Sequence, residues 1–392
     1  MPPYLAGRED EQREFARLLD QDVILENLIL TGLRGLGKTV LLETFKPLAI
    51  NAGWLWAGAD LSESTSISEE SLATRLLTDL SIVTSQVVVA AEGDTPIGFT
   101  GDRPRRETAL DFPTLLGAYQ QTPGLIIDKL KAVLEWVWSL LAPIGKRGIV
   151  FAYDEAQNLA DHAPKEQYPL SLLLDLFQSL QRKDIRFMLA LTGLPTLFPK
   201  LVESRTYSER MFRVLFLKPL SHDDTIEAIR RPVQREKGFP IEFSSDTLTR
   251  IWSVTKGYPY FVQFVCREVF DVWVQSLNSG QPALPVPMHA ILRKLDTDFF
   301  AGRWAKATDR QRDLLTIIAG LQNCDQEFTV QDITESAANR ALETPFSSSH
   351  VNQMLTKLAD VGLIFKNRHG KYSFAVPLLG DFIQRQRDDA LV

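Results

Sequence analysis

The sequence has few cysteines, no long apolar run and no basic excess. Its two cysteines, Cys266 and Cys324, cannot build a disulfide framework, and they lack the spacing of metal ligands. This usage is typical of a reducing compartment, and no signal peptide is apparent, so we expect a cytoplasmic protein. The longest apolar stretches, such as 130–144, are interrupted by charged residues and a proline. We therefore expect no membrane span, which needs roughly 20 apolar residues.

The charge balance argues against a surface that is basic over the whole chain. Lys and Arg number 43 and Asp and Glu number 49, which gives a net charge of −6. Proteins that bind nucleic acid or anionic membranes over a wide surface usually carry the opposite sign, although a local basic patch remains open. Apolar residues make up 45% of the 392 residues and charged residues 23%, as in ordinary globular proteins. The length predicts two or three domains.

Short apolar segments alternate with helical patterns through the first half of the chain. We expect strands near 28–30, 53–60, 148–153 and 185–191, with helices between them. This alternation predicts an α/β fold with a parallel sheet covered on both faces. Residues 83–124 differ in composition, since Gly, Pro, Thr and charged residues dominate there. We interpret them as an insertion with a β-hairpin and a flexible arm. We interpret the basic run Arg103, Arg105 and Arg106 as a solvated loop, the alternative being contact with phosphate backbone, a partner or another subunit.

The strongest motif is TGLRGLGKT, residues 31–39. It fits the pattern G-x-x-x-x-G-K-[ST], in which glycines let backbone N–H groups turn toward phosphate oxygens. Lys38 would reach the β- and γ-phosphates and Thr39 would ligate Mg²⁺, while the following helix adds its positive N-terminal end. An apolar strand precedes the motif and a helix follows it, as phosphate binding by such a loop requires.

A second motif, GIVFAYDEA, supplies the acidic half of a nucleotide site. An apolar strand delivers Asp154 and Glu155 at its carboxyl end, where α/β sheets bind ligands. The role for Asp154 is to hold Mg²⁺, and the role for Glu155 is to orient and deprotonate the attacking water. Together the two motifs predict a site that binds and hydrolyses a nucleotide with Mg²⁺. GTP in place of ATP is left open by these motifs, although no N-K-x-D segment of the GTPase type is present.

Six segments occur in an order that resembles an AAA+/STAND P-loop ATPase of the archaeal-ATPase and origin-recognition-like group. They are LAGREDE, TGLRGLGKT, VFAYDEA, LALTGLP, ERMFRVLFLKPLS and KGYPYFVQ. The resemblance covers about 4–273 and implies a P-loop NTPase parallel sheet with a helical lid. It also implies an ATPase that binds ATP with Mg²⁺. Helices near 309–321, 330–338 and 349–361, followed by two short strands, extend it with a C-terminal winged helix-turn-helix. We expect a core over 1–218, a lid over 219–280, a linker and connecting helix over 281–303, and the winged helix over 304–392.

The resemblance also implies roles for individual residues. Thr192 takes the place of sensor 1 near the γ-phosphate, the alternative being a threonine that caps the next turn. Of the cluster Arg205, Arg210 and Arg213, we favour Arg210 and then Arg205 as an arginine finger donated to a neighbouring subunit, although a salt bridge is the simpler interpretation of each. The nucleotide pocket is expected to include Gly7, Arg8, Glu9, Gly32, Gly35, Leu36, Gly37, Lys38, Thr39, Val40 and Pro259.

The segment KGYPY, residues 256–260, resembles the G-x-P feature of the STAND signalling branch. Some replication-type relatives place a sensor arginine in this region, so the segment favours a switch over a replication initiator. Pro259 at the start of a helix is also an ordinary local feature.

The C-terminal region offers an interaction surface whose partner the sequence leaves open. Lys366, Arg368 and Lys371 make the predicted wing locally basic, yet residues 304–392 hold ten Lys and Arg against eleven Asp and Glu. We expect either DNA contact through these three cations or a protein partner. The first hypothesis for the whole chain is therefore an ATP-dependent switch that forms a homo-oligomer. The alternatives are a DNA-binding AAA+ ATPase, acting as loader or regulator of a DNA transaction, and a nucleotide-binding scaffold.

Overall fold

The computed structural model describes residues 4–85, 88–91, 106–234, 243–280, 286–338, 345–368 and 370–389. They divide into two compact units, which we call the sheet unit and the helical unit. The sheet unit comprises residues 9–31 and 38–216, and the helical unit comprises 1–8, 32–37 and 217–392. Among the described residues, no helix combines the length and apolar character that a membrane crossing requires.

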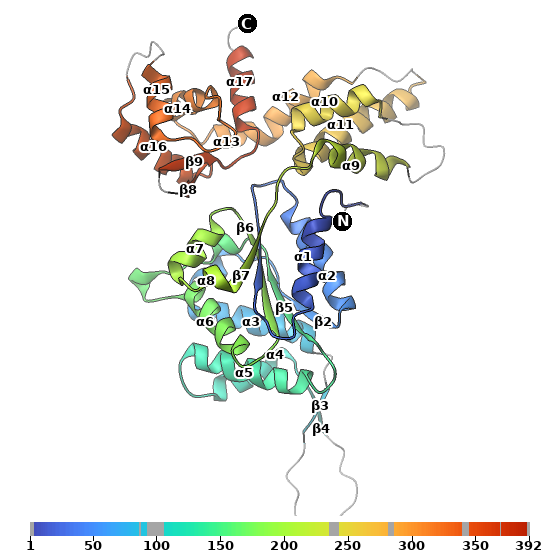
Figure 1. The fold of residues 1–392 in the computed structure, drawn as a ribbon, viewed down its shortest axis with the longest axis vertical. Coiled ribbons are helices and arrows are strands. Elements are labelled where there is room, and N and C mark those ends of the chain that lie inside the picture. The colour runs from blue at the N-terminus through green and yellow to red at the C-terminus, as the bar shows by residue number, and fades with distance from the viewer. Residues whose placement is uncertain are drawn as a thin grey trace, which may run out of the picture. The chain divides into compact units, whose positions relative to one another are not determined.

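The sheet unit is built on a five-stranded parallel sheet with the strand order β2-β5-β6-β1-β7 (Figure 1). Its strands are β1 (Asn27–Thr31), β2 (Trp54–Ala57), β5 (Gly148–Tyr153), β6 (Phe187–Gly193) and β7 (Phe212–Phe216). The central strands β1, β5 and β6 are buried along their whole length, as the uninterrupted apolar runs in the sequence predict. The predicted α/β class with a parallel sheet is confirmed.

Helices cover both faces of this sheet. They are α1 (Glu9–Leu19), α2 (Lys38–Asn51), α3 (Glu69–Thr84), α4 (Phe112–Gln121), α5 (Ile126–Leu141), α6 (Pro169–Gln181), α7 (Leu197–Ser204) and α8 (Ser208–Met211). The helices α1 and α2 lie on one face, where the Phe15 and Phe45 rings stack with centroids 4.3 Å apart. The helices α3, α5 and α6 lie on the other face, where Phe151 of β5 contacts Phe177 and Phe187 edge-on.

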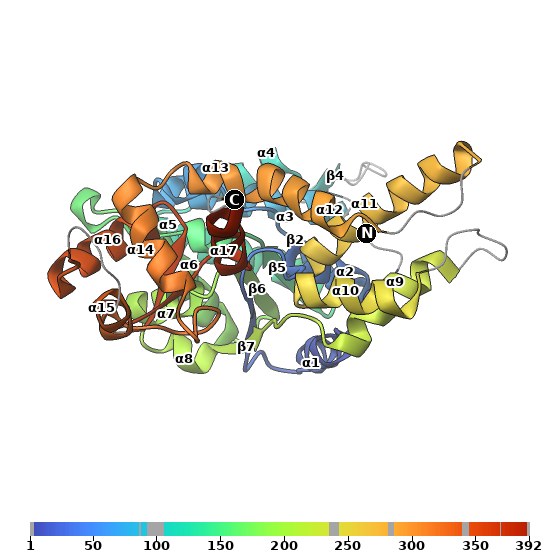
Figure 2. The same cartoon turned by 90° about the horizontal axis from the view of Figure 1, so that it is seen from above.

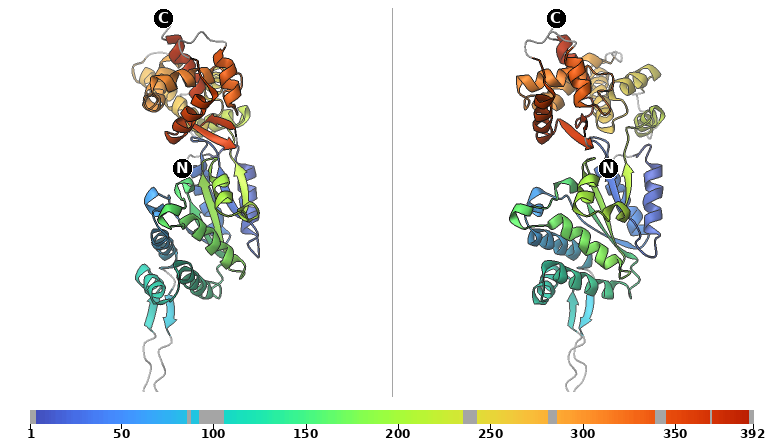
Figure 3. Two further views of the ribbon diagram at one scale, coloured as in Figure 1. Left: turned by 90° about the vertical axis from the view of Figure 1, so that its left-hand side faces the viewer. Right: turned by 60° about the vertical axis from the view of Figure 1, so that its left-hand side comes forward.

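The segment 83–124, predicted as an insertion, contains a hairpin and a helix. The strands β3 (Val88–Ala91) and β4 (Arg106–Ala109) form the expected antiparallel hairpin, which Figure 3 shows at the end of the sheet unit where α4 lies. Residues 110–124, however, belong to the core, because Leu115 and Tyr119 of α4 are buried against its neighbours. Asp111 caps α4 by accepting a hydrogen bond from the Thr114 N–H at 3.0 Å. The predicted arm, with Arg103 and Arg105, lies outside the described residues.

The helical unit contains two groups of helices, which Figure 2 shows separately. The first group comprises α9 (His222–Gln234), α10 (Ser245–Thr255) and α11 (Pro259–Asn278), which share an apolar core. The helix α12 (Met288–Leu295) continues through a π-helical turn at Asp296–Ala301 into α13 (Gly302–Trp304). The second group comprises α14 (Asp309–Ala319), α15 (Val330–Ala338), α16 (Ser348–Asp360), the antiparallel strands β8 (Ile364–Arg368) and β9 (Lys371–Phe374), and α17 (Leu379–Asp389).

The edge pair β2–β5 depends on a close backbone approach at Gly58. A Cβ on this residue would lie 1.9 Å from the Ala152 carbonyl oxygen, and Gly58 has a φ of 137°. The approach continues the pairing beyond β2, since the Leu61 N–H donates to the Asp154 carbonyl at 2.9 Å. It therefore sets the position of the acidic residues that follow β5.

We predict that Gly58→Ala lowers the thermal unfolding midpoint by roughly 4–8 °C, because the added methyl group and the left-handed backbone both add strain. Gly117→Ala is the matched control, since nothing lies within 4 Å of a Cβ at this helical position. Calorimetry of the three proteins measures the difference. An unchanged midpoint for Gly58→Ala would contradict the close approach.

Candidate nucleotide site

Residues 32–37, the part of the phosphate-binding motif that belongs to the helical unit, form what we call the phosphate loop. This loop is hydrogen-bonded to the start of α11. Gly35 has a φ of 80°, which favours glycine, and a Cβ there would lie 3.0 Å from the Tyr260 Cβ. The Gly35 carbonyl accepts a hydrogen bond from the Tyr260 N–H at 3.1 Å. Pro259 occupies the first position of α11, where its missing N–H costs nothing. Gly35 and Pro259, both predicted as pocket residues, are thus brought together.

Arg8 holds the same loop from the other end. Its guanidinium is buried and donates from Nη2 to the Leu36 carbonyl at 3.2 Å and to the Lys218 carbonyl at 2.8 Å. Leu36 is itself buried, and Gly7 packs against the Asp224 side chain of α9. Arg8 therefore stabilises the loop through main-chain carbonyls. Its contact with a nucleotide, and those of Gly7 and Leu36, stay predictions.

The next residues of the motif open α2 in the sheet unit. Lys38, Thr39 and Val40 form the first turn of this helix, directly after Gly37 in the chain. The Thr39 hydroxyl donates to the Asp154 carboxylate, with Oγ1 and Oδ2 2.5 Å apart. The two sequence motifs therefore meet in space, as expected of residues that share one metal ion.

Asp154 is a buried carboxylate among other acidic groups. Only 5% of the residue is exposed, and its second oxygen accepts a hydrogen bond from the Glu155 N–H at 2.7 Å. Burial raises the pKa of Asp154, and the nearby Glu155 and Asp60 carboxylates raise it further, although the hydrogen bonds from Thr39 and Glu155 oppose them. Negative charge gathered beside a hydroxyl is a donor set that fits a hard divalent cation such as Mg²⁺.

Glu155 follows in a left-handed turn that directs its side chain toward solvent. Its φ is 51° and ψ is 33°, and the side chain is exposed. One carboxylate oxygen accepts a hydrogen bond from the Gln157 side-chain amide. An exposed, oriented carboxylate at this edge of the sheet can accept a proton from water.

Thr192 is the last residue but one of β6, the strand that lies between β1 and β5. In the register of the sheet, Thr192 pairs with Leu30 of β1, and Gly193 pairs with Thr31. The hydroxyl oxygens of Thr31 and Thr192 are both buried and, among the described residues, neither has a hydrogen-bond partner. Buried hydroxyls normally find partners, so these two at the ligand-binding edge of the sheet are consistent with polar groups supplied by a ligand.

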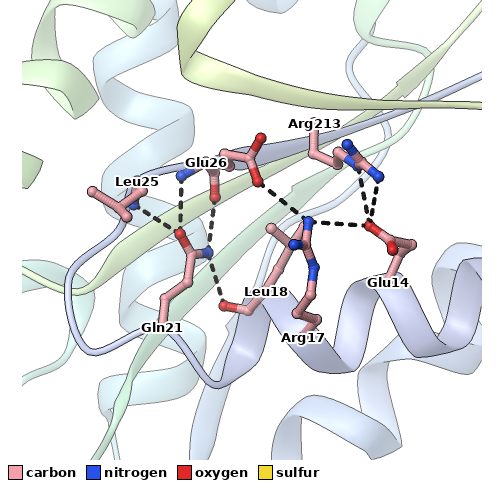
Figure 4. Close-up of polar contacts among 7 residues, drawn as sticks. All are labelled: Glu14, Arg17, Leu18, Gln21, Leu25, Glu26 and Arg213. Carbon is pink, nitrogen blue, oxygen red and sulfur yellow. Dashed lines mark hydrogen bonds and ion pairs between the residues drawn. The ribbon is translucent and has the colours of Figure 1, made fainter.

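The three arginines of the predicted finger cluster differ in their partners. Arg205 is held by Asp175 through two hydrogen bonds of 2.9 and 2.7 Å, and the Tyr207 hydroxyl binds the same carboxylate. Arg213 binds Glu14 of α1 at 3.0 Å, and Figure 4 shows this pair within a wider network. Arg210 is exposed and makes no ion pair within the described part of the chain. Of the three, Arg210 is therefore available to a second subunit, and the finger role stays a prediction.

The three cations of the predicted wing, Lys366, Arg368 and Lys371, also differ in their partners and exposure. Arg368 pairs with Glu327 at 2.8 Å, and Asn367 donates to the same carboxylate at 3.0 Å. These hydrogen bonds lower the pKa of Glu327, so the pair stays charged. Lys366 is exposed and Lys371 is half-buried. The structure therefore leaves Arg368 partly neutralised.

Two residues that the sequence analysis missed belong to this site. Asp60 follows β2 and pairs with Asp154 as a continuation of the sheet, and Gln157 binds Glu155. The signal for Asp60 was its place directly after an apolar segment that was predicted as a parallel strand. Gln157 had no comparable signal, because its contact depends on the turn after β5.

Comparison with solved structures shows where this architecture occurs. The Aeropyrum pernix ORC2 protein in its ADP form matches with a TM-score of 0.56 and 14% identity, over 98% of this chain and 96% of that one. The same protein in its ADPNP–ADP complexes matches with a TM-score of 0.54 and 14% identity, over 99% and 96%. These matches show that the chain is similar in fold to this ORC2 protein, an α/β fold with a parallel sheet.

Comparison by sequence adds one local match. A family model described as a domain of unknown function (DUF8462) matches residues 297–383, from the π-helical turn into α17. No curated protein matches the chain.

We predict that Thr39→Val weakens Mg²⁺-dependent ATP binding by about tenfold or more, because the isosteric side chain leaves the buried Asp154 carboxylate without its hydroxyl donor. Thr39→Ser keeps the hydroxyl and is expected to bind like the wild type. Calorimetry with and without Mg²⁺ measures both. Equal Mg²⁺-dependent affinities for Thr39→Val and the wild type would remove Thr39 from the metal site.

Proposed function

We propose that this protein is an ATP-binding and ATP-hydrolysing switch of the AAA+/STAND type, whose nucleotide state controls self-assembly and the C-terminal module. The observation that carries the proposal is the hydrogen bond between Thr39 and Asp154. It joins the phosphate-binding motif to the acidic motif, which lies more than a hundred residues later in the sequence, and leaves Glu155 exposed beside them.

The proposed chemistry assigns one task to each group. Lys38 binds the β- and γ-phosphates, and Thr39 and Asp154 hold Mg²⁺, which neutralises charge on the phosphates when bound. Glu155 orients a water molecule and accepts its proton, and Thr192 donates toward the γ-phosphate. The remaining pocket residues are Gly7, Arg8, Gly32, Gly35, Leu36, Gly37, Val40 and Pro259.

Contacts within the helical unit support the switch function. The phosphate loop binds the start of α11 through Gly35, and the preceding turn carries Lys256. Lys256 pairs with Asp325 at 2.7 Å and with Asp381 at 2.8 Å, both in the C-terminal module. Burial alone would lower the pKa of Lys256, but these two carboxylates outweigh it and raise the pKa, so the lysine stays charged. A change at the phosphate loop thus has a short physical route to the C-terminal module.

We predict that Glu155→Gln retains ATP but stops its turnover, since the neutral amide cannot accept a proton from water. The trapped ATP state is expected to self-associate, with Arg210 reaching the neighbouring nucleotide. Phosphate release and light scattering with and without ATP measure the two effects.

Arg210→Ala in the Glu155→Gln background is expected to weaken the association, while Arg213→Ala serves as the control at a paired arginine. Turnover at the wild-type rate would exclude Glu155 as the base, and a monomer in both nucleotide states would exclude a finger acting on a second subunit.

A second candidate function is DNA binding by the C-terminal module, which we propose to be a winged helix-turn-helix. The helix α16 exposes polar side chains, including Asn352, Gln353 and Lys357, while its apolar residues are buried. Polar side chains on an exposed helix can bind base edges in the major groove. The hairpin β8–β9 follows with Lys366 exposed at its outer side. A protein partner for the same face is the competing outcome.

We predict that neutralising Lys366, Arg368 and Lys371 flattens the salt dependence of DNA affinity by about 2 units of log–log slope, at roughly 0.9 per phosphate contact. The change is less than three contacts would give, because Glu327 already pairs with Arg368. Accordingly, Arg368→Gln alone is expected to change the slope less than Lys366→Gln. If the wild type does not bind DNA with ATP at low salt, the module contacts protein instead.

A further inference from the structure

The side chain of Gln157 connects the proposed base to the strand that carries Thr192. Gln157 lies in the short 3₁₀ turn Ala156–Asn158, directly after Glu155. Its Nε2 donates to a carboxylate oxygen of Glu155, and its Oε1 accepts a hydrogen bond from the Leu194 N–H at 3.1 Å. Leu194 follows the end of β6, two residues after Thr192.

The surroundings allow only one orientation of this amide. The oxygen must face Leu194, because a main-chain N–H can only donate, and the nitrogen must face Glu155, because an ionised carboxylate can only accept. A Cβ on Gly193 would lie 2.7 Å from Oε1, so the absence of a side chain there admits the amide. The main-chain carbonyl of Gln157 is held independently by Lys200, whose Nζ lies 2.7 Å away.

We propose that Gln157 is a positioning residue that holds the Glu155 carboxylate at a fixed position relative to the end of β6. Glu155 needs such support, because its side chain is exposed and no other described side chain is seen to bind it. With the support, the base and Thr192 approach the γ-phosphate as a pair rather than independently. The inference rests on the proposed ATPase function and assigns to this residue a task that the sequence did not reveal.

The first test removes the amide and keeps the size of the side chain. Gln157→Leu loses both hydrogen bonds, and Gln157→Glu keeps an acceptor for Leu194 but cannot donate to Glu155 when ionised. Both variants are expected to lower kcat by about 10- to 100-fold, as misplacement of a reacting group does, with KM and ATP affinity unchanged within about twofold. If Gln157 had only a structural role, its substitution would change KM and stability along with kcat.

Asn158→Leu provides the matched control within the same turn. The Asn158 side chain donates to the Leu61 carbonyl at 2.9 Å, and among the described residues it makes no hydrogen bond to the Glu155 carboxylate. Only the Asn158 main-chain N–H binds Glu155, at its main-chain carbonyl, and the substitution leaves that bond in place. This variant also removes a hydrogen bond from the turn, so it is expected to lower the unfolding midpoint with kcat nearly unchanged. An equal loss of kcat in Asn158→Leu and Gln157→Leu would overturn the positioning role.

The decisive measurement is a double-mutant cycle with Glu155→Gln. If Gln157 acts through Glu155, adding Gln157→Leu changes the residual hydrolysis of Glu155→Gln by less than about twofold. Multiplicative losses would overturn the inference, and so would wild-type kcat in Gln157→Leu. Failure of the wild-type protein to hydrolyse ATP would overturn the proposed function itself, and with it this inference.

Discussion

The buried carboxylate of Asp154 is the constraint on which the arrangement of the site depends. A charged group in this position is costly unless hydrogen-bond donors surround it, and here the Thr39 hydroxyl and the Glu155 N–H supply them. The first donor brings the start of α2 to the end of β5. The second requires the chain to turn immediately after Asp154, which places Glu155 in its left-handed conformation. Satisfying one carboxylate thus orders both motifs.

The strand order explains why a third segment joins them. Because β6 lies between β1 and β5, its carboxyl end lies between the strand before the phosphate loop and the strand before Asp154. Thr192 and Leu194 come from this end. Gln157, in the turn after β5, can therefore bind both Leu194 and Glu155. The same edge also receives Asp60 from β2, so groups from four strands gather where a parallel sheet binds its ligands.

In the helical unit, the candidate site is stabilised through main-chain groups, whereas in the sheet unit it is stabilised mainly through side chains. The phosphate loop is held through carbonyls, by the Tyr260 N–H and by the buried guanidinium of Arg8. The ion pairs of Lys256 then connect the neighbouring turn to the C-terminal module. The loop and the module thus both contact the segment 256–260, and the proposed switch function rests on these contacts.

Local sequence determined much of the fold and named the residues at the centre of the candidate site. Apolar runs predicted the strands β1, β5 and β6, and motif spacing predicted Lys38, Thr39, Asp154 and Glu155, because strand propensity and glycine conformation act over a few residues. The helix α4 was missed because its buried face lies in a segment with the composition of a loop.

Only the tertiary structure decided which polar groups meet. The partners of Arg205, Arg213 and Arg368 are carboxylates distant in the sequence, and so is the Leu194 N–H that orients Gln157. Such pairs have no period and no fixed spacing, since they depend on strand order and on how neighbouring turns pack. The sequence by itself determined the chemistry that each segment can offer, whereas the parallel sheet determined which of these groups act together, because it brings the ends of separate strands to one edge.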